Sequence, residues 1–188
     1  YCTYAGNPYF IDLDKLAEMG LQEKADYATI KWCDEPGKVD YGKLYENRYP
    51  VLRKATKAFL ENTPDDFAAF CEENDYWLAD FALFMALKDA HGGAQWSEWK
   101  EELKNREADA LANAEKEYAN DIMFWKVVQY LFFHQWKELK AYANENRKMQ
   151  LLAVVFSIIY MLGYQLNSML MGYVYLSLAL DVIMCFMI

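Results

Sequence analysis

The chain has 188 residues, of which 55% are hydrophobic and 17% aromatic, and its formal net charge is −9. A hydrophobic content this high excludes an intrinsically disordered protein. The acidic balance argues against a nucleic-acid partner, because phosphate binding needs a basic surface. With only 8 Gly and 4 Pro, collagen-like and linker-rich proteins are excluded as well.

Charge is distributed unevenly along the chain. All 19 basic residues and all but one of the 28 acidic residues lie in residues 1–148, whereas Met149–Leu180 carries no charge. We therefore expect two parts, an acidic globular domain over residues 1–148 and an apolar tail over residues 149–188. The sequence opens at Tyr1 without a basic stretch, which predicts no signal peptide and indicates a fragment or a processed product. The four cysteines form no C-x-x-C pair, which is typical of reduced thiols and predicts a cytoplasmic protein.

Helix signals follow one another from the start of the chain. Asp12 or Asp14 is expected to begin a short helix that stops at Gly20. Residues 31–50 have the composition of a loop, and a helical pattern is expected from Val51 onward. The apolar positions of that pattern are Leu52, Ala55, Phe59 and Leu60.

Further helices are expected over the next hundred residues. Thr63 is the predicted N-cap of a helix with Pro64 at its first position. A second helix is expected to start near Asn74 and to end at His91, before two glycines. Residues 106–146 contain no Gly or Pro, which predicts one long helix or two helices with a break near Asn120. The apolar side of this stretch includes Ile122, Trp125, Val128, Leu131, Phe132, Trp136 and Leu139. The predicted fold class is mainly α.

Residues with catalytic chemistry are sparse. His134 has only Glu138 as a partner one helical turn away, so we expect no metal site there. His91 is expected at a helix C-terminus, where a cation is favourable. Adjacent carboxylates such as Asp65 and Asp66 point about 100° apart on a helix and do not face one substrate. The sequence therefore assigns no catalytic residue, no metal ligand and no cofactor.

Aromatic residues are in surplus, with 15 Tyr and 6 Trp. An aromatic ring offers an apolar face on which the flat face of a sugar can stack, while the tyrosine hydroxyl can hydrogen-bond. Rings at helical spacing are expected in the core, so the sugar-contact candidates are the tyrosines expected in loops. These are Tyr4, Tyr9, Tyr41 and Tyr45.

Several stretches resemble signature sequences of the amylomaltases, the bacterial and plant 4-α-glucanotransferases. The stretch from Ala5 to Asp14 reads AGNPYFIDLD and adds Asn7 to the candidate sugar contacts. The order and spacing of the similar stretches agree from about Tyr1 to Asn144. The others are residues 39–41, 52–55, 70–74, 76–78, 81–88, 91–94 with Trp96 and Trp99, 131–133, 135–136 and 139–144.

The resemblance implies a (β/α)8-barrel enzyme that cleaves an α-1,4-glucan or maltooligosaccharide and transfers the piece to another glucan or to glucose. Such enzymes work with retention, through a covalent glycosyl-aspartate. The present stretch would be a largely helical insertion subdomain that helps wall the glucan groove, with the barrel itself largely missing. The carboxylates of the family's active site would follow Asn144 and match nothing here. We therefore predict a fragment that is inactive alone.

The tail over residues 149–188 is open to three interpretations. It could form a membrane hairpin, which would make the protein a membrane-anchored helical module without catalysis, although Asp181 is costly in lipid. It could form buried strands, because residues 154–160 and 173–176 are rich in β-branched and aromatic side chains. It could also be an out-of-frame or chimaeric translation, since charge disappears where the resemblance ends.

Overall fold

We describe the fold from a computed structural model, which describes residues 2–35, 37–145 and 155–161. Every regular element in these ranges is a helix, so the prediction of a mainly α protein is confirmed. The chain divides into two compact units, Tyr1–Gln135 and Trp136–Ile188, which are described separately. The expected division at residues 148 and 149 stays a prediction.

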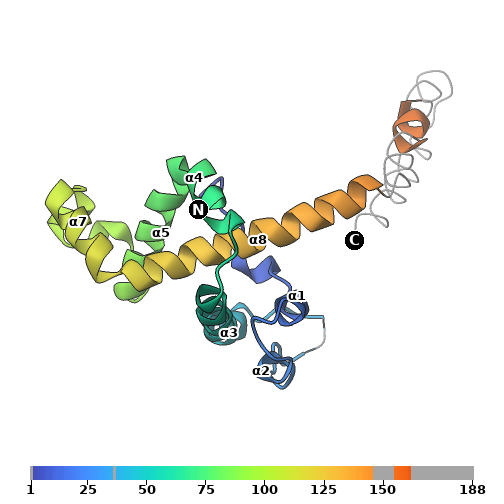
Figure 1. Cartoon of the computed structure of the whole chain (residues 1–188). Helices are drawn as coiled ribbons and strands as arrows, with labels where there is room; N and C mark the ends of the chain where they lie inside the picture. Colours follow the sequence, from blue (N-terminus) through green and yellow to red (C-terminus); the bar gives the residue numbers. More distant parts are fainter. Residues whose placement is uncertain (1, 36, 146–154, 162–188) are drawn as a thin grey trace. The chain divides into compact units, whose positions relative to one another are not determined.

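The first unit holds nearly all of the described elements (Figure 1). The last of them, helix α8, begins in this unit and continues beyond Gln135. In chain order they are η1 (Pro8–Phe10), α1 (Leu13–Glu18), α2 (Ala25–Ala28), α3 (Tyr41–Glu61), α4 (Asp66–Glu73), α5 (Asp75–Ala90), η2 (Trp96–Glu98), α6 (Glu101–Lys104), α7 (Ala108–Glu117) and α8 (Ala119–Glu145).

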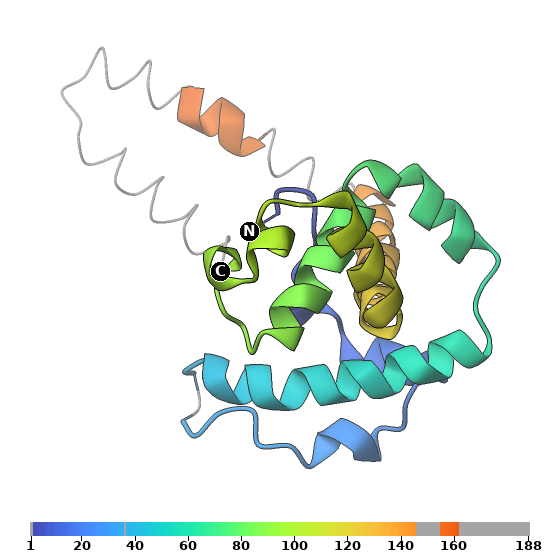
Figure 2. The same cartoon turned by 90° about the vertical axis from the view of Figure 1, so that its left-hand side faces the viewer.

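Helix α8 is the centre of the first unit. Its residues from Val127 to Leu131 are all buried. A helix that packs against a single neighbour buries only one side, so this part of α8 must have neighbours on several sides. Helices α3 and α5 lie beside this part of α8 (Figures 1 and 2). Aromatic rings make the contacts: the ring of Trp125 lies 5.7 Å from Tyr49 of α3 and 6.1 Å from Phe81 of α5. The core is therefore built around one helix that has neighbours on several sides.

Most of the predicted helix ends are confirmed. Asp12 caps α1, because its carboxylate accepts from the backbone N–H of Asp14 at 2.9 Å. Gly20 follows α1 with a φ of 75°, a conformation that glycine adopts without strain. Helix α5 ends with Gly93 donating its N–H to the carbonyl of Lys88 at 2.8 Å. The break in the long stretch falls at Tyr118, two residues before the predicted position.

Two expectations about α3 and α4 are wrong. The expected loop over residues 31–50 ends early, because α3 starts at Tyr41 and continues through Pro50. Asp40 starts the helix by accepting from the N–H of Lys43 at 3.1 Å. Thr63 does not cap α4, whose N-cap residue is Asp65, without a side-chain capping bond. The Thr63 hydroxyl donates to the carbonyl of Phe59 at 3.4 Å, and α4 begins at Asp66.

Some residues expected on apolar helix faces are exposed. Leu60 lies near the end of α3 and is 43% exposed. Trp136 and Leu139 follow the buried part of α8 and are also exposed. The apolar periodicity of each helix therefore extends beyond the part that packs against the core.

Of the tail, only residues 155–161 are described, and they are helical. The expectation of a strand over residues 154–160 is therefore wrong for 155–160, where β propensity is overridden. The other tail expectations, including the membrane hairpin, fall mostly outside the described residues. Among the residues that are described, no helix combines the length and the apolar character needed to cross a membrane.

Candidate functional site

The segment from Gly6 to Asp12 is attached to α8 by two glutamine side chains. Gln129 accepts from the N–H of Gly6 at 2.7 Å and donates to the carbonyl of the same residue at 3.0 Å. Gln135 pairs with Asp12 in the same way, with distances of 2.7 and 3.0 Å. A primary amide carries both a donor and an acceptor, so each glutamine satisfies both backbone groups of one residue.

Only glycine fits at position 6, because there is no room for a side chain. A Cβ built on Gly6 would overlap the ring of Phe132, which is three residues after Gln129 on α8 and therefore on the same side of the helix. Gly6 has no positive φ, so conformational freedom is not the reason for a glycine here. The close approach of the segment to α8 depends on the missing side chain.

Arg48 of α3 holds the same segment from another element. Its Nε donates to the carbonyl of Pro8 at 3.2 Å, and its terminal nitrogen donates to the carbonyl of Ile11. Burial lowers the pKa of Arg48 from its usual value, but an arginine remains protonated in proteins. The 3₁₀ turn η1 is thus fixed by three side chains, from α3 and α8.

Tyr9 of η1 lies near two tyrosines of α3, Tyr45 and Tyr49. The ring of Tyr49 lies 6.2 Å from that of Tyr9 and 5.2 Å from that of Tyr45. Burial raises the pKa values of Tyr9 and Tyr49, so both hydroxyls stay neutral near pH 7 and can donate hydrogen bonds. Tyr45 is 56% exposed and extends this group of rings to the surface. We call Tyr9, Tyr45 and Tyr49 the tyrosine cluster.

The structure separates the predicted sugar contacts into different places. Tyr9 and Tyr45 meet through Tyr49. Asn7 is exposed, and its side chain accepts from the N–H of Tyr9 at 3.0 Å. Tyr41, the first residue of α3, is 68% exposed.

Tyr4 belongs to another group of rings. Its ring lies 5.4 Å from that of Tyr76 and 6.3 Å from that of Trp77, both on α5. Tyr4 and Tyr76 are 57% and 71% exposed. The interpretation of these residues as sugar contacts stays a prediction.

The sequence interpretation missed the residues that organise this site. Arg48, Gln129 and Gln135 act on backbone groups far away in the sequence, so no local pattern marks them. Tyr49 follows Tyr45 by four residues, which places both on one side of a helix. That signal was hidden because residues 31–50 were interpreted as a loop.

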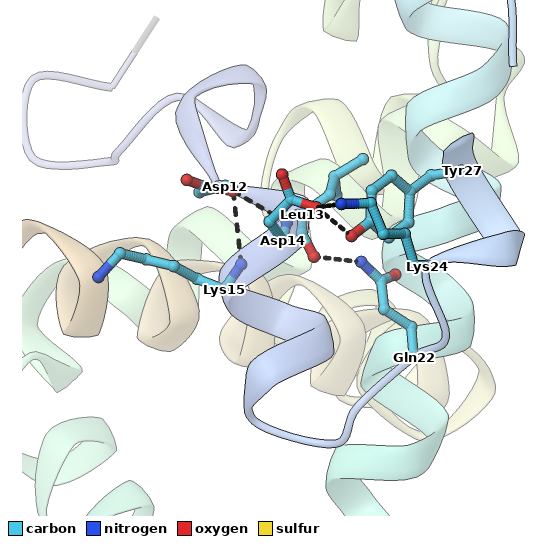
Figure 3. Close-up of polar contacts among 7 residues, drawn as sticks. All are labelled: Asp12, Leu13, Asp14, Lys15, Gln22, Lys24 and Tyr27. Carbon is cyan, nitrogen blue, oxygen red and sulfur yellow. Dashed lines mark hydrogen bonds and ion pairs between the residues drawn. The ribbon is translucent and has the colours of Figure 1, made fainter. Parts of the chain in front are cut away.

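A polar network stabilises the segment that follows η1 (Figure 3). The hydroxyl of Tyr27 donates to Asp14 at 2.6 Å, and the ammonium of Lys24 lies 3.5 Å from the same carboxylate. Gln22 donates to the carbonyl of Leu13 at 2.9 Å. These contacts tie the chain after α1 back onto the start of that helix.

Replacing Tyr27 with phenylalanine is expected to raise the pKa of Asp14. That pKa lies below its ordinary value mainly because of the Tyr27 hydrogen bond and secondly because of Lys24; the same bond raises the pKa of Tyr27 to about 12. A depressed carboxyl pKa contributes stability that is lost as the pH falls through the folded-state value. An NMR titration of the side-chain carboxyls checks this, with Tyr76→Phe as the control. An unchanged Asp14 pKa would assign the shift to Lys24.

Within the residues that the structure describes, no cluster of three or more His, Cys, Asp or Glu could hold a metal ion. His91 ends α5 as predicted, with its Nδ1 2.7 Å from the carbonyl of Leu87 and its ring stacked 5.2 Å from Trp99. The ring of His134 lies 6.0 Å from that of Tyr130.

Comparisons with known proteins agree with this architecture. A profile of the 4-alpha-glucanotransferase family matches residues 1–155. The 4-alpha-glucanotransferase of Clostridium butyricum is 40% identical over 146 residues, which cover 78% of this chain and 30% of that protein. The enzyme of Thermus thermophilus is 44% identical over 148 residues, with 77% and 29% covered.

A solved structure, the amylomaltase from Streptococcus agalactiae in complex with acarbose, is also similar. It superposes with a TM-score of 0.72 at 40% identity, over 76% of this chain and 29% of that one. The chain thus spans about 30% of the length of the relatives that it matches. From the family profile and these relatives, we conclude that the chain belongs to the 4-alpha-glucanotransferase family.

Proposed function

We propose that this chain serves a retaining 4-α-glucanotransferase that disproportionates maltooligosaccharides. The observation that carries the proposal is the family match over residues 1–155, at about 40% identity to curated relatives. Such an enzyme breaks an α-1,4 bond through a covalent glycosyl-aspartate and passes the glycosyl group to a second sugar. The substrate is an α-1,4-glucan, no cofactor is needed, and the expected location is cytoplasmic.

The role proposed for this chain is to form one wall of the glucan groove. Its residues would be the helical insertion of a (β/α)8 barrel, with a domain boundary near residue 148. Exposed rings support this role, because Tyr41 and Tyr45 can both be reached from solvent. Together with Tyr4, Tyr9 and Asn7, they are the sugar contacts that we propose.

No residue of the chain is proposed as a catalytic acid, base or nucleophile. The resemblance assigns the catalytic carboxylates to sequence that follows the similar stretch. The chain would therefore bind and position substrate for groups that it does not itself supply.

Two measurements test the proposal together. The purified 188-residue chain should release no glucose from maltotriose. A chimaera that carries residues 1–144 in place of the aligned segment of the Thermus thermophilus enzyme should release glucose by disproportionation. The matched control is the same enzyme with that segment deleted. Activity of the isolated chain, or a folded but inactive chimaera, would contradict the proposal.

A further inference from the structure

The two glutamine pairs have the same separation in sequence. Gly6 and Gln129 are 123 residues apart, and so are Asp12 and Gln135. The segment therefore runs parallel to α8, and both paired stretches contain the same number of residues. Six residues of an α-helix rise about 9 Å, whereas six residues of extended chain would span about 20 Å.

The segment must therefore contract between its two attachment points. The turn η1 provides this contraction, because a 3₁₀ helix rises about 2 Å per residue. Arg48 fixes the turn by donating to the carbonyls of Pro8 and Ile11. The spacing of the two glutamines on a rigid helix thus sets the length of the segment, and Arg48 sets the turn within it.

Asn7 and Tyr9 lie between the two attachment points. Asn7 accepts from the N–H of Tyr9, and the ring of Tyr9 lies 6.2 Å from Tyr49. Gln129 is fully buried, so its pairing with Gly6 is shielded from competing water. The backbone that carries Tyr9 is therefore held on both sides, at Gly6 by Gln129 and at Asp12 by Gln135.

We propose that Gln129, Gln135 and Arg48 are positioning residues, which place Tyr9 and Asn7 for contact with the glucan. They act through the backbone of residues 6–12 and do not touch the sugar. This inference rests on the proposed function, because it needs Tyr9 to be a sugar contact. Beyond the proposed function, it states that α8 and α3 set the geometry of that contact.

The variant Gln135→Met tests the proposal in the full chain. Methionine keeps the length of the side chain and removes both hydrogen bonds to Asp12. Gln135 is buried, but its partner Asp12 is exposed, so water can reach the backbone groups of Asp12 when the bonds are lost and the variant is expected to fold. The matched control is Gln95→Met, since Gln95 is exposed and makes no capping bond.

Two measurements distinguish loss of the Gln135–Asp12 hydrogen bonds from loss of sugar binding. Hydrogen exchange of the Asp12 amide should accelerate in Gln135→Met and stay unchanged in Gln95→Met. The dissociation constant of maltoheptaose should rise about tenfold in Gln135→Met, at a temperature where both variants are fully folded. Arg48→Lys keeps the charge, loses the paired donation to two carbonyls, and should weaken maltoheptaose binding in the same direction.

A double-mutant cycle with Tyr9→Ala decides whether Gln135 acts through Tyr9. Tyr9→Ala alone should weaken maltoheptaose binding, and adding Gln135→Met should then have little further effect, because residues that act as a unit are not additive. Additive effects, or unchanged affinity despite faster exchange at Asp12, would overturn the positioning role and leave the proposed function standing. No binding by the unmodified chain would overturn the proposed sugar contacts and this inference with them.

Discussion

Replacing Gly6 with alanine is expected to lower the free energy of unfolding by about 2–4 kcal/mol. The new methyl group would overlap the ring of Phe132, and relieving such an overlap in a packed core costs about 1–3 kcal/mol. Moving the segment away would also weaken the two hydrogen bonds to the buried Gln129, which adds about 1 kcal/mol or more. Urea unfolding followed by tryptophan fluorescence measures the change.

Gly42→Ala is the matched control for this prediction. Gly42 lies in the first turn of α3, and a Cβ there would meet only a carboxylate oxygen of Asp40, at 3.3 Å. That oxygen also caps α3 by accepting from Lys43 and must shift slightly, which offsets the gain of about 0.4–1 kcal/mol from replacing a helical glycine. Gly6→Ala should therefore destabilise the protein clearly more than Gly42→Ala does. If Gly6→Ala is as stable as the unmodified chain, the segment does not pack on Phe132 as described.

Replacing Trp125 with alanine is expected to cost about 3–5 kcal/mol, the usual range for removing a large buried ring. Trp125 is only 2% exposed and contacts rings from α3 and α5. Its indole N–H also donates to Asp89 at 3.0 Å. Burial raises the pKa of Asp89, so losing this donor leaves a half-buried carboxyl with less compensation.

The control for Trp125 is Trp96→Ala. Trp96 lies on η2 and is 55% exposed, so its removal should change stability by no more than about 0.5 kcal/mol. Thermal and urea unfolding of both variants provide the comparison. Equal losses at the two positions would contradict the central place of α8 in the core.

How much the sequence predicts depends on whether a signal is local. Caps and glycines act within a few residues, and the ends at Asp12, Gly20 and Gly93 were predicted from them. The start of α3 was missed because residues 31–50 were interpreted as a loop from their composition, whereas the helix runs through Pro50. A proline inside a helix forfeits one backbone hydrogen bond and strains the preceding turn, and here α3 tolerates that cost. Thr63 has two acceptable partners, and the structure uses the carbonyl of Phe59.

The candidate site was harder to predict than the helices. The aromatic surplus identified Tyr9 and Tyr45, but their convergence on Tyr49 requires residues 41–49 to be helical. Gln129 and Gln135 look like ordinary polar residues in an amphipathic helix. Their roles depend on contacts across 123 residues, which a single sequence does not reveal. Family resemblance supplied the proposed activity, which the residues alone did not indicate.

The equal separation of the two glutamine pairs also has a consequence for the order of folding. During synthesis the stretch from Gly6 to Asp12 emerges long before Gln129 and Gln135, so it must wait for most of the chain before its backbone groups are paired. Contacts this distant in sequence form slowly, because loop closure must come first. Length changes in the intervening loops are expected to leave the pairing intact, whereas one residue added or removed between Gly6 and Asp12 is expected to disrupt it. We therefore expect the segment that carries Tyr9 to tolerate distant insertions and not local ones.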